Sequence, residues 1–359
     1  MAKQGVSTIH NMATQGVGSG RSNLRDVARV AGVSISTASI ALRNHPRTAL
    51  ATREAVHAAA EKLGYVPNSL GRGLRARRAG AIALVIPHSG EHLATHPYYL
   101  TLLYGIIERC NLADLALLLS TSPAEKDEAS AYLHILQSRA ADGVIVASAA
   151  LGDRNVLRLA ASGFPTVFIG RFPDQVQLET IGIDDRLGAL LATDHLIEAH
   201  RRSQIAYLAG PMDALAAVDR LDGYRTSLAR HGLVFREELV FRGNFDRESG
   251  EATCRELLAS GVRFDAIFAG NDDMAGGALG VLRDGGIRVP EDVPLVGFDD
   301  LLLAPVLSPA LTTVRQPVHD LGWAAASRLL ELLADSSAEA HQSLLPVELV
   351  LRRSCGCGA

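Results

Sequence analysis

The hydrophobic pattern of this 359-residue chain changes at about residue 80. Before this point, apolar residues recur at helical spacing. After it, short continuous apolar runs alternate with segments of helical length. Short continuous apolar runs are typical of strands buried on both faces of a parallel sheet. The pattern therefore predicts a small all-helical region followed by a larger body of alternating strands and helices.

Two sets of apolar runs predict the strands of the body. They lie at 81–87, 115–121, 143–148 and 165–170, and then at 204–210, 266–272 and 293–300. Parallel strands with helices on both faces form doubly wound sheets, so two sets predict two lobes. We expect the first lobe to comprise about 80–182 and 318–341, and the second about 183–317 and 342–359.

The helical region predicts a helix-turn-helix. Gly32 marks a tight turn after a first short helix, and Ser34 is placed to accept backbone N–H bonds at the start of a second. A third helix is expected over roughly 49–63, with Thr48 able to cap it because Ala49 cannot. In a helix-turn-helix, the second helix enters the major groove of DNA with its N-terminal end first.

Charge is distributed unevenly along the chain. Up to Gly80 there are 12 Lys and Arg residues and 3 Asp and Glu residues, a net charge of +9. The remainder carries −13, which gives the total of −4. A strongly basic region on an acidic body points to a polyanion partner for the basic region, and nucleic acid fits the helix-turn-helix.

Other features argue against a secreted, membrane-bound or enzymatic protein. No apolar run approaches the ~20 residues needed to cross a bilayer, and residues 1–20 lack the apolar segment of a secretory signal. No P-loop, nucleophile elbow or metalloprotease helix is present, and no acid/base pair is identifiable. We therefore expect a cytoplasmic, nucleoid-associated protein that is not an enzyme and needs no cofactor.

No metal site is predicted from the cysteines and histidines. The four cysteines are too few and too scattered for a disulfide framework. Cys355 and Cys357 lack a neighbouring histidine in the sequence, so we interpret them as part of a frayed tail. The loop that carries His88, His92 and His96 is interpreted as solvated.

The segment D-V-A-R-V-A-G-V-S-I-S-T-A-S at 26–39, followed by L-G-Y-V-P-N at 63–68, resembles the DNA-binding head of the lac repressor family of bacterial regulators. The likeness continues to Arg353. It implies a tail at 1–21 that is disordered, a helix-turn-helix domain at 22–66 and a hinge helix at 67–79. It also implies an effector-binding and dimerisation body at 80–359, with the two-lobed α/β fold of periplasmic binding proteins.

The resemblance assigns base readout to the second helix. Ile35, Ser36 and Ile40 are expected to face base edges in the major groove. Many relatives carry Arg where Ile40 stands, and an aliphatic side chain offers only apolar contact, so the operator preference should differ. The residues expected to contact the DNA backbone are Ser34, Thr37, Ser39, Asn44, Arg72, Arg75 and Arg77. Leu74 is expected to enter the minor groove when the hinge folds on DNA.

Polar and aromatic residues at the predicted strand ends form a candidate effector site, because ligands of such sheets bind beyond the carboxyl ends of the strands. The candidates are Tyr98, Tyr99, Arg171, Arg220, Phe245, Asn271 and Asp299. By resemblance, Arg220, Asn271 and Asp299 hold polar groups of the effector, and the aromatic residues form walls. Asp272, Asp273 and Asp300 are interpreted as helix caps.

These features together predict a ligand-controlled transcription factor. We expect a repressor of a carbohydrate-utilisation operon that binds a near-palindromic operator as a homodimer and responds to a small polar effector, most simply a sugar. One alternative is a nucleobase or another metabolite that acts as co-repressor. A sugar-binding transport protein is a second alternative, but it would need an export signal and no DNA-binding head.

Overall fold

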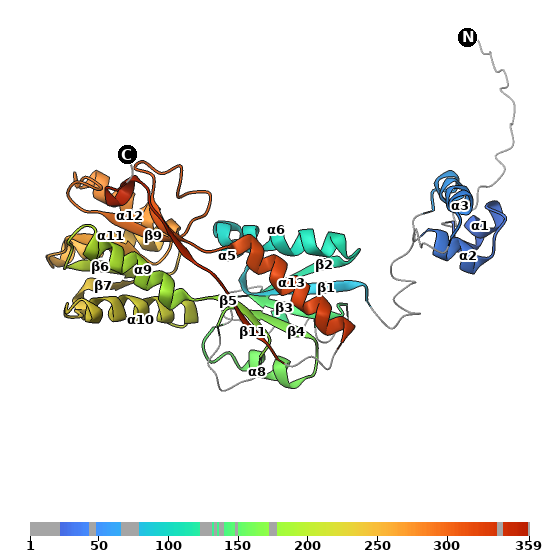
Figure 1. The fold of residues 1–359 in the computed structure, drawn as a ribbon, viewed down its shortest axis with the longest axis horizontal. Helices are drawn as coiled ribbons and strands as arrows, with labels where there is room; N and C mark the ends of the chain where they lie inside the picture. Colours follow the sequence, from blue (N-terminus) through green and yellow to red (C-terminus); the bar gives the residue numbers. More distant parts are fainter. Residues whose placement is uncertain are drawn as a thin grey trace, which may run out of the picture. The chain divides into compact units, whose positions relative to one another are not determined.

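The computed structural model describes residues 22–42, 48–65, 79–122, 131–132, 135, 140–147, 150–171, 178–335 and 340–357. The chain forms two compact units, Met1–Arg75 and Ala76–Ala359. Among the described residues, the first unit has three short helices and the second has two mainly parallel sheets with their helices (Figure 1).

The N-terminal unit is a helix-turn-helix followed by a third helix. Its helices are α1 (Leu24–Val30), α2 (Ile35–Ala41) and α3 (Leu50–Lys62). Small buried side chains, among them Ala38 and Ala41 of α2 and Ala59 and Ala60 of α3, form most of its core with Val56. Small residues at helix contacts let the helices approach closely, so a short sequence can enclose a core.

Capping residues define where these helices begin. Asn23 and Asp26 form a capping box at the start of α1, and the Ser34 hydroxyl accepts the backbone N–H of Thr37 at 3.0 Å. The cap of α3 differs from the sequence expectation. Ala49 occupies the N-cap position and no side chain caps the helix, so the expected capping by Thr48 is wrong. Thr48 lies one residue too early in the chain for that role.

The first lobe of the body contains a six-stranded, entirely parallel sheet in the order β11-β5-β4-β3-β1-β2. Its strands are β1 (Ala81–Ser89), β2 (Ala116–Ser122), β3 (Gly143–Ala147), β4 (Thr166–Ile169), β5 (Thr180–Ile183) and β11 (Gln342–Leu345). Its helices are α5 (Gly90–Thr95), α6 (Pro97–Leu112), α8 (Arg154–Ala161) and α13 (Val318–Ala334).

The second lobe repeats this design, with strand order β12-β10-β9-β8-β6-β7, and only β12 runs antiparallel to its neighbour. Its strands are β6 (Ile205–Ala209), β7 (Val240–Arg242), β8 (Ala266–Ala269), β9 (Leu295–Asp299), β10 (Thr312–Arg315) and β12 (Glu348–Val350). Its helices are α9 (Asp185–Glu198), α10 (Leu215–Arg230), α11 (Arg247–Ser260) and α12 (Asp272–Asp284), with the short η1 (Glu237–Leu239) and η2 (Arg353–Cys355).

Alternation along β1 explains why its apolar run is continuous. Ile82 and Leu84 belong to the core beneath α6 and α13, whereas Ala83 and Val85 pack with the α8 side chains. Because successive side chains of a strand point to opposite faces, a strand covered on both sides must be apolar throughout. Figure 1 shows α6 and α13 on one side of this sheet and α8 on the other.

The point at which the chain returns to the second lobe differs from the expectation. Gln342–Leu345 forms β11, which pairs with β5 in the first sheet rather than with the second lobe. The return therefore occurs after Leu345, four residues later than the expected start at 342, and β12 is the strand that joins the second sheet. The physical reason is that the open edge of β5 pairs with this segment, which covers its unpaired backbone groups.

Two further interpretations of the sequence are wrong. The segment after β1 is the short helix α5, not an irregular loop. Cys355 does not lie in a frayed tail. It is buried in η2, where the Ser354 hydroxyl donates to the carbonyl of Leu295 at 2.6 Å and accepts the backbone N–H of Thr312 at 2.8 Å. Among the described residues, no helix has the length and hydropathy needed to cross a bilayer.

Candidate effector cleft and DNA-binding head

A cavity of about 660 Å³ lies between the two lobes, and its lining combines the strand ends of both sheets. All seven candidate effector residues line it: Tyr98, Tyr99, Arg171, Arg220, Phe245, Asn271 and Asp299. The chain positions of these residues span about 200 residues, and the doubly wound topology brings them together because the carboxyl ends of parallel strands share an edge.

Arg220 is the central cation of this cleft. It lies on α10 and is buried, and its Nε donates to Asp185 at 2.8 Å while Nη1 donates to the Gly270 carbonyl at 2.6 Å. Nη1 also lies 3.7 Å from the Asp299 carboxylate. The guanidinium stacks on the Phe298 ring at 3.6 Å. A planar guanidinium held on several sides is fixed in one orientation, which a polar ligand requires.

Asp299 is the buried carboxylate opposite Arg220. It ends β9, and its φ of 116° is a backbone conformation that L residues rarely adopt. Burial raises the pKa of Asp299 to about 7, although Arg220 and the amide of Gln316, which donates to it, act in the opposite direction. A buried carboxyl group with a pKa near neutral pH can accept hydrogen bonds from hydroxyls when it is ionised, and it can also take up a proton.

Asn271 and Phe245 lie together on another wall. The Asn271 Oδ1 caps α12 by accepting the Met274 N–H at 2.9 Å, and its Nδ2 donates to the Phe245 carbonyl at 2.7 Å. The aromatic ring lies against Gly210, where an added Cβ would be 2.2 Å from it. Glycine is therefore required at 210 for Phe245 to take this position. The Asn271 side chain itself fixes the loop that carries the ring.

Tyr98 and Tyr99 begin α6 and differ in burial. Tyr99 is 5% exposed and belongs to the core of the first lobe, while Tyr98 is partly buried, with its ring 5.5 Å from that of Tyr99 in an edge-to-face arrangement. Burial raises the pKa of Tyr98, so its hydroxyl stays protonated and available as a hydrogen-bond donor.

Two contacts link the lobes across the cleft. Arg171, which follows β4, donates from Nε and Nη2 to the two carboxylate oxygens of Asp219 on α10, at 2.9 and 2.7 Å. The Leu151 N–H donates to the Asp213 carbonyl at 2.7 Å, next to a β-bridge between Ala150 and Ala214. These contacts hold the lobes together around the cavity.

Three residues that organise the cleft are not among the candidates predicted from the sequence. Asp185, Asp219 and Gln316 line it and bind Arg220, Arg171 and Asp299 respectively. Asp185 follows β5, a strand whose T-I-G-I run is too short for the pattern to identify. Asp219 lies one residue before Arg220 on α10, and the packing of this helix brings both side chains to the cleft.

The interpretation of Asp272 and Asp300 as helix caps is wrong. Asn271 caps α12, and Asp272 instead accepts the Thr313 hydroxyl at 2.6 Å and the Leu301 N–H at 3.1 Å. Asp300 pairs with Arg315 at 2.7 Å and with Arg352 at 2.6 Å. Both carboxylates therefore stabilise the second lobe and lie outside the cavity lining.

The residues of α2 that are expected to contact DNA are exposed or partly exposed. Ala38 and Ala41 point into the core, and Ile35 is 41% exposed beside the exposed Ser36. Ile40 is partly exposed, as are Thr37 and Ser39. The Ser34 hydroxyl lies 2.8 Å from both the Ser36 and the Thr37 hydroxyls. The DNA-backbone candidates Asn44, Arg72, Arg75 and Arg77 and the wedge candidate Leu74 lie outside the described residues.

A helix-turn-helix joined to a two-lobed body with a polar cleft defines a ligand-responsive DNA-binding regulator. The chain belongs to the lacI family of bacterial regulatory proteins, whose model matches residues 23–68. A periplasmic binding protein-like domain matches residues 193–355.

The relatives are regulators with the same architecture. The HTH-type transcriptional regulator CelR of Thermobifida fusca is 37% identical over 340 residues, which cover 93% of this chain and 98% of CelR. The structure of a CelR–cellobiose complex aligns with a TM-score of 0.72 at 36% identity, over 93% of this chain and 100% of that one. The lac repressor dimer bound to operator and the anti-inducer ONPF aligns with a TM-score of 0.80 at 29% identity, over 94% and 99%. These findings confirm the predicted family, the fold class and a regulatory rather than enzymatic function.

Proposed function

We propose that this protein is a cytoplasmic repressor of carbohydrate-utilisation genes. It binds a near-palindromic operator as a homodimer, and a neutral sugar of about disaccharide size in the cleft controls that binding. The observation that carries this proposal is the Arg220–Asp299 pair, buried between aromatic rings in a cavity of about 660 Å³.

The charges of the cleft favour a neutral effector. Within the described lining, five aspartates face two arginines, and both arginines are already paired with aspartates. The aspartates are Asp153, Asp185, Asp213, Asp219 and Asp299. A phosphorylated or carboxylated ligand would meet a net negative field and no uncommitted cation among these groups. A polyol avoids this cost because its hydroxyls donate to carboxylates and accept from the guanidinium.

Each candidate residue has a proposed role toward a sugar. Asp299 accepts hydrogen bonds from a pair of hydroxyls, Arg220 and Asn271 bind neighbouring oxygens, and Phe245 and Tyr98 pack against the apolar C–H face of the ring. Tyr99 and Arg171 complete the walls. The similarity to CelR, which has a structure in complex with cellobiose, makes cellobiose the first compound to test.

An exposed apolar stripe on α6 supports the homodimer. Leu100, Tyr104 and Ile107 lie on one helix face at i, i+4 and i+7, and they are 54%, 61% and 38% exposed. Large exposed apolar side chains grouped on a helix face are typical of an interface. A dimer is also what a near-palindromic operator requires, because one recognition helix reads one half-site.

Calorimetry on the full-length protein tests the effector assignment. The compounds are cellobiose, galactose, a sugar phosphate and a purine base, and a fluorescent operator selected from a random DNA library reports DNA binding. We expect cellobiose or another neutral sugar to bind and to change operator affinity, and Asp299→Asn to remove this response without loss of operator binding by the ligand-free protein. Binding of the purine base alone would instead support a nucleobase effector, and binding of the sugar phosphate alone would contradict the charge argument.

A further inference from the structure

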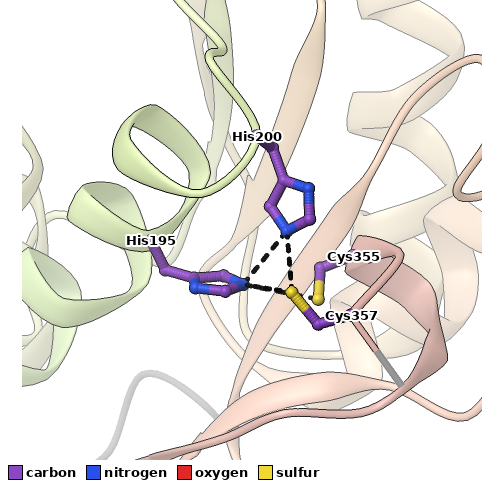
Figure 2. Close-up of side chains that lie close together, drawn as sticks. All are labelled: His195, His200, Cys355 and Cys357. Atoms are coloured by element: carbon purple, nitrogen blue, oxygen red, sulfur yellow. Dashed lines mark hydrogen bonds between the residues drawn. The ribbon is translucent and has the colours of Figure 1, made fainter. Parts of the chain in front are cut away.

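Two cysteines near the end of the described chain lie close to His195 in α9 and to His200 in the loop that follows (Figure 2). Cys357 Sγ lies 3.2 Å from His200 Nε2 and 3.7 Å from His195 Nε2, and Cys355 Sγ lies 3.4 Å from His195 Nε2. The two histidine nitrogens are 3.2 Å apart. All four ligand-type atoms lie within 4.8 Å of one another.

Four of the six distances between these atoms are close to the edges of a metal-centred tetrahedron. With Zn–N of about 2.05 Å and Zn–S of about 2.3 Å, tetrahedral geometry gives about 3.3 Å between two nitrogens and about 3.6 Å between nitrogen and sulfur. The observed nitrogen–nitrogen distance is 3.2 Å, and three of the four nitrogen–sulfur distances are 3.2, 3.4 and 3.7 Å. The fourth nitrogen–sulfur distance and the sulfur–sulfur distance are within 4.8 Å. One ion at the centre would therefore reach all four atoms with small side-chain shifts.

The backbone brings each ligand to this point. His195 lies in the last turn of α9, and His200 follows in the next loop, an H-x4-H spacing that is common among zinc ligands. Gly356 separates the cysteines with a φ of 97°, a conformation that L residues rarely adopt, and this turn lets both sulfurs face the histidines. The Thr312 hydroxyl donates to Cys355 Sγ at 3.0 Å, which is an outer contact typical of metal-bound thiolates.

We propose that His195, His200, Cys355 and Cys357 bind one Zn²⁺ ion in a closed, structural site. Four protein ligands leave no position open for a substrate, and two thiolates with two imidazoles form a ligand set that favours zinc over Mg²⁺ or Ca²⁺. The site joins η2 to α9, so it fastens the end of the described chain to the second lobe. It does not depend on the identity of the effector.

The partial exposure of the cluster is consistent with a metal that enters after folding. Cys357 is exposed, both histidines are partly buried, and Cys355 is 2% exposed. Three ligands thus stand in a preformed pocket, and the fourth closes it from the solvent side. The competing chemistry is a disulfide between Cys355 and Cys357, which would withdraw both thiolates from the histidines.

Metal analysis of the full-length protein tests the proposal. The protein is produced without a histidine tag in zinc-supplemented medium, dialysed and analysed by inductively coupled plasma mass spectrometry. We expect about one zinc ion per chain in the wild type and less than about a tenth of this in Cys357→Ser and His200→Gln, because three ligands do not form a closed site. The matched controls, Cys110→Ala in the first lobe and His231→Gln on the surface of the second, should retain the wild-type content.

Cobalt substitution gives a second readout that does not require a variant to fold. After chelator treatment, addition of Co²⁺ to the wild type should produce the intense visible bands of tetrahedral cobalt and a near-ultraviolet thiolate charge-transfer band. Chelator should also lower the melting temperature of the wild type and leave that of Cys357→Ser unchanged.

Three results would overturn the proposal. The first is a wild type that neither carries zinc nor gives the tetrahedral cobalt spectrum. The second is zinc retained in both ligand variants, since the metal would then bind elsewhere. The third is a Cys355–Cys357 disulfide, seen by mass spectrometry of peptides from freshly purified protein, together with no metal uptake after reduction.

Discussion

Arg171 and Asp219 form a two-point ion pair that connects the lobes of the body. The guanidinium donates from Nε and Nη2 to the two carboxylate oxygens at 2.9 and 2.7 Å. Arg171 follows β4 in the first lobe, and Asp219 lies on α10 in the second, one residue before the central Arg220. Because both residues line the cleft, this pair links closure of the lobes to the geometry that a ligand meets.

We predict that Asp219→Asn opens the cleft more often. The amide cannot complete the charge-assisted pair, so the closed arrangement loses stability relative to the open one. We expect faster effector association and faster hydrogen exchange in α10, measured by stopped-flow fluorescence and mass spectrometry. Asp222→Asn is the matched control, because Asp222 lies on the same helix and forms an exposed ion pair with Arg186 of α9. Equal effects of the two substitutions would show that the cross-lobe pair has no special role.

Asp299→Asn should reduce effector affinity about 10- to 100-fold, since hydrogen bonds to charged groups contribute roughly 1.5–3 kcal/mol. The substitution preserves shape and leaves Arg220 paired with Asp185 at 2.8 Å, so the fold should be retained. Calorimetry measures the affinity, and circular dichroism checks the fold. Asp153→Asn changes another aspartate of the cavity lining and should have a smaller effect. Unchanged affinity in Asp299→Asn would remove Asp299 from the proposed site.

Effector affinity should rise with pH around neutrality. The pKa of Asp299 is raised to about 7. Burial is the largest cause, Asp273 and Asp185 act in the same direction, and Arg220 and Gln316 act against it. Below this pH the carboxyl group is protonated and accepts fewer hydroxyls, so affinity should fall by up to about tenfold per pH unit. Calorimetry between about pH 5.5 and pH 8 tests this, and Asp299→Asn should flatten the profile. A profile unchanged by that substitution would assign the titration to a group other than Asp299.

Stability of the ligand-free protein should depend on pH in the opposite sense. The folded pKa of Asp299 lies above its ordinary value of 3.8. Protonated Asp299 therefore contributes its full stabilisation at pH values below 3.8. This contribution is lost as the pH rises through about 7. Urea unfolding of the wild type and of Asp299→Asn, at pH values near 3.8 and near 7, measures this contribution to the free energy of unfolding. A difference between the two proteins that does not change with pH would contradict the raised pKa.

The apolar runs predicted the central strands well because those strands are buried on both faces. β1, β3 and β8 coincide closely with predicted runs. The strands that the pattern missed are short or lie toward sheet edges, such as Thr180–Ile183, Thr312–Arg315 and Gln342–Leu345. Their residues are partly polar or interrupted by glycine, so local hydropathy carries little information about them, and they form strands through pairing with neighbours.

Individual residues of the cleft could be predicted from the sequence, but the ion pairs between them could not. Asp299 and Asn271 could be predicted because they lie at the ends of apolar runs, and the topology of a parallel sheet places strand ends beside the ligand site. The partners of Arg171 and Arg220 could not be predicted, since Asp219 and Asp185 are placed by helix packing. The Cys355–His195 contact joins residues 160 positions apart, and local spacing gives no information about such a contact.

Base-reading and phosphate-binding residues of the head should respond differently to substitution. We predict that Ile40→Arg changes the preferred operator sequence with little change in salt dependence, because the side chain is partly exposed on α2 and faces base edges by resemblance. Arg77→Ala should weaken binding to all sequences and reduce the slope of log K against log[salt] by about 0.9. Fluorescence anisotropy on selected and random DNA at several salt concentrations measures both effects. A shift in sequence preference from Arg77→Ala would contradict its assignment to the DNA backbone.

Ala49→Ser should stabilise the DNA-binding head. Ala49 is the N-cap of α3, its backbone is already extended, with φ −58° and ψ 143°, and no side chain satisfies the first N–H groups of the helix. A serine hydroxyl at this position would do so, which is worth about 1 kcal/mol. Ala58→Ser, at an exposed position within α3, is the control and should cost a few tenths of a kcal/mol. The single tryptophan, Trp323, lies in α13 of the body, so fluorescence does not report on the head. Hydrogen exchange of the α3 amides does, and unchanged protection in Ala49→Ser would show that the N-cap does not limit the stability of this helix.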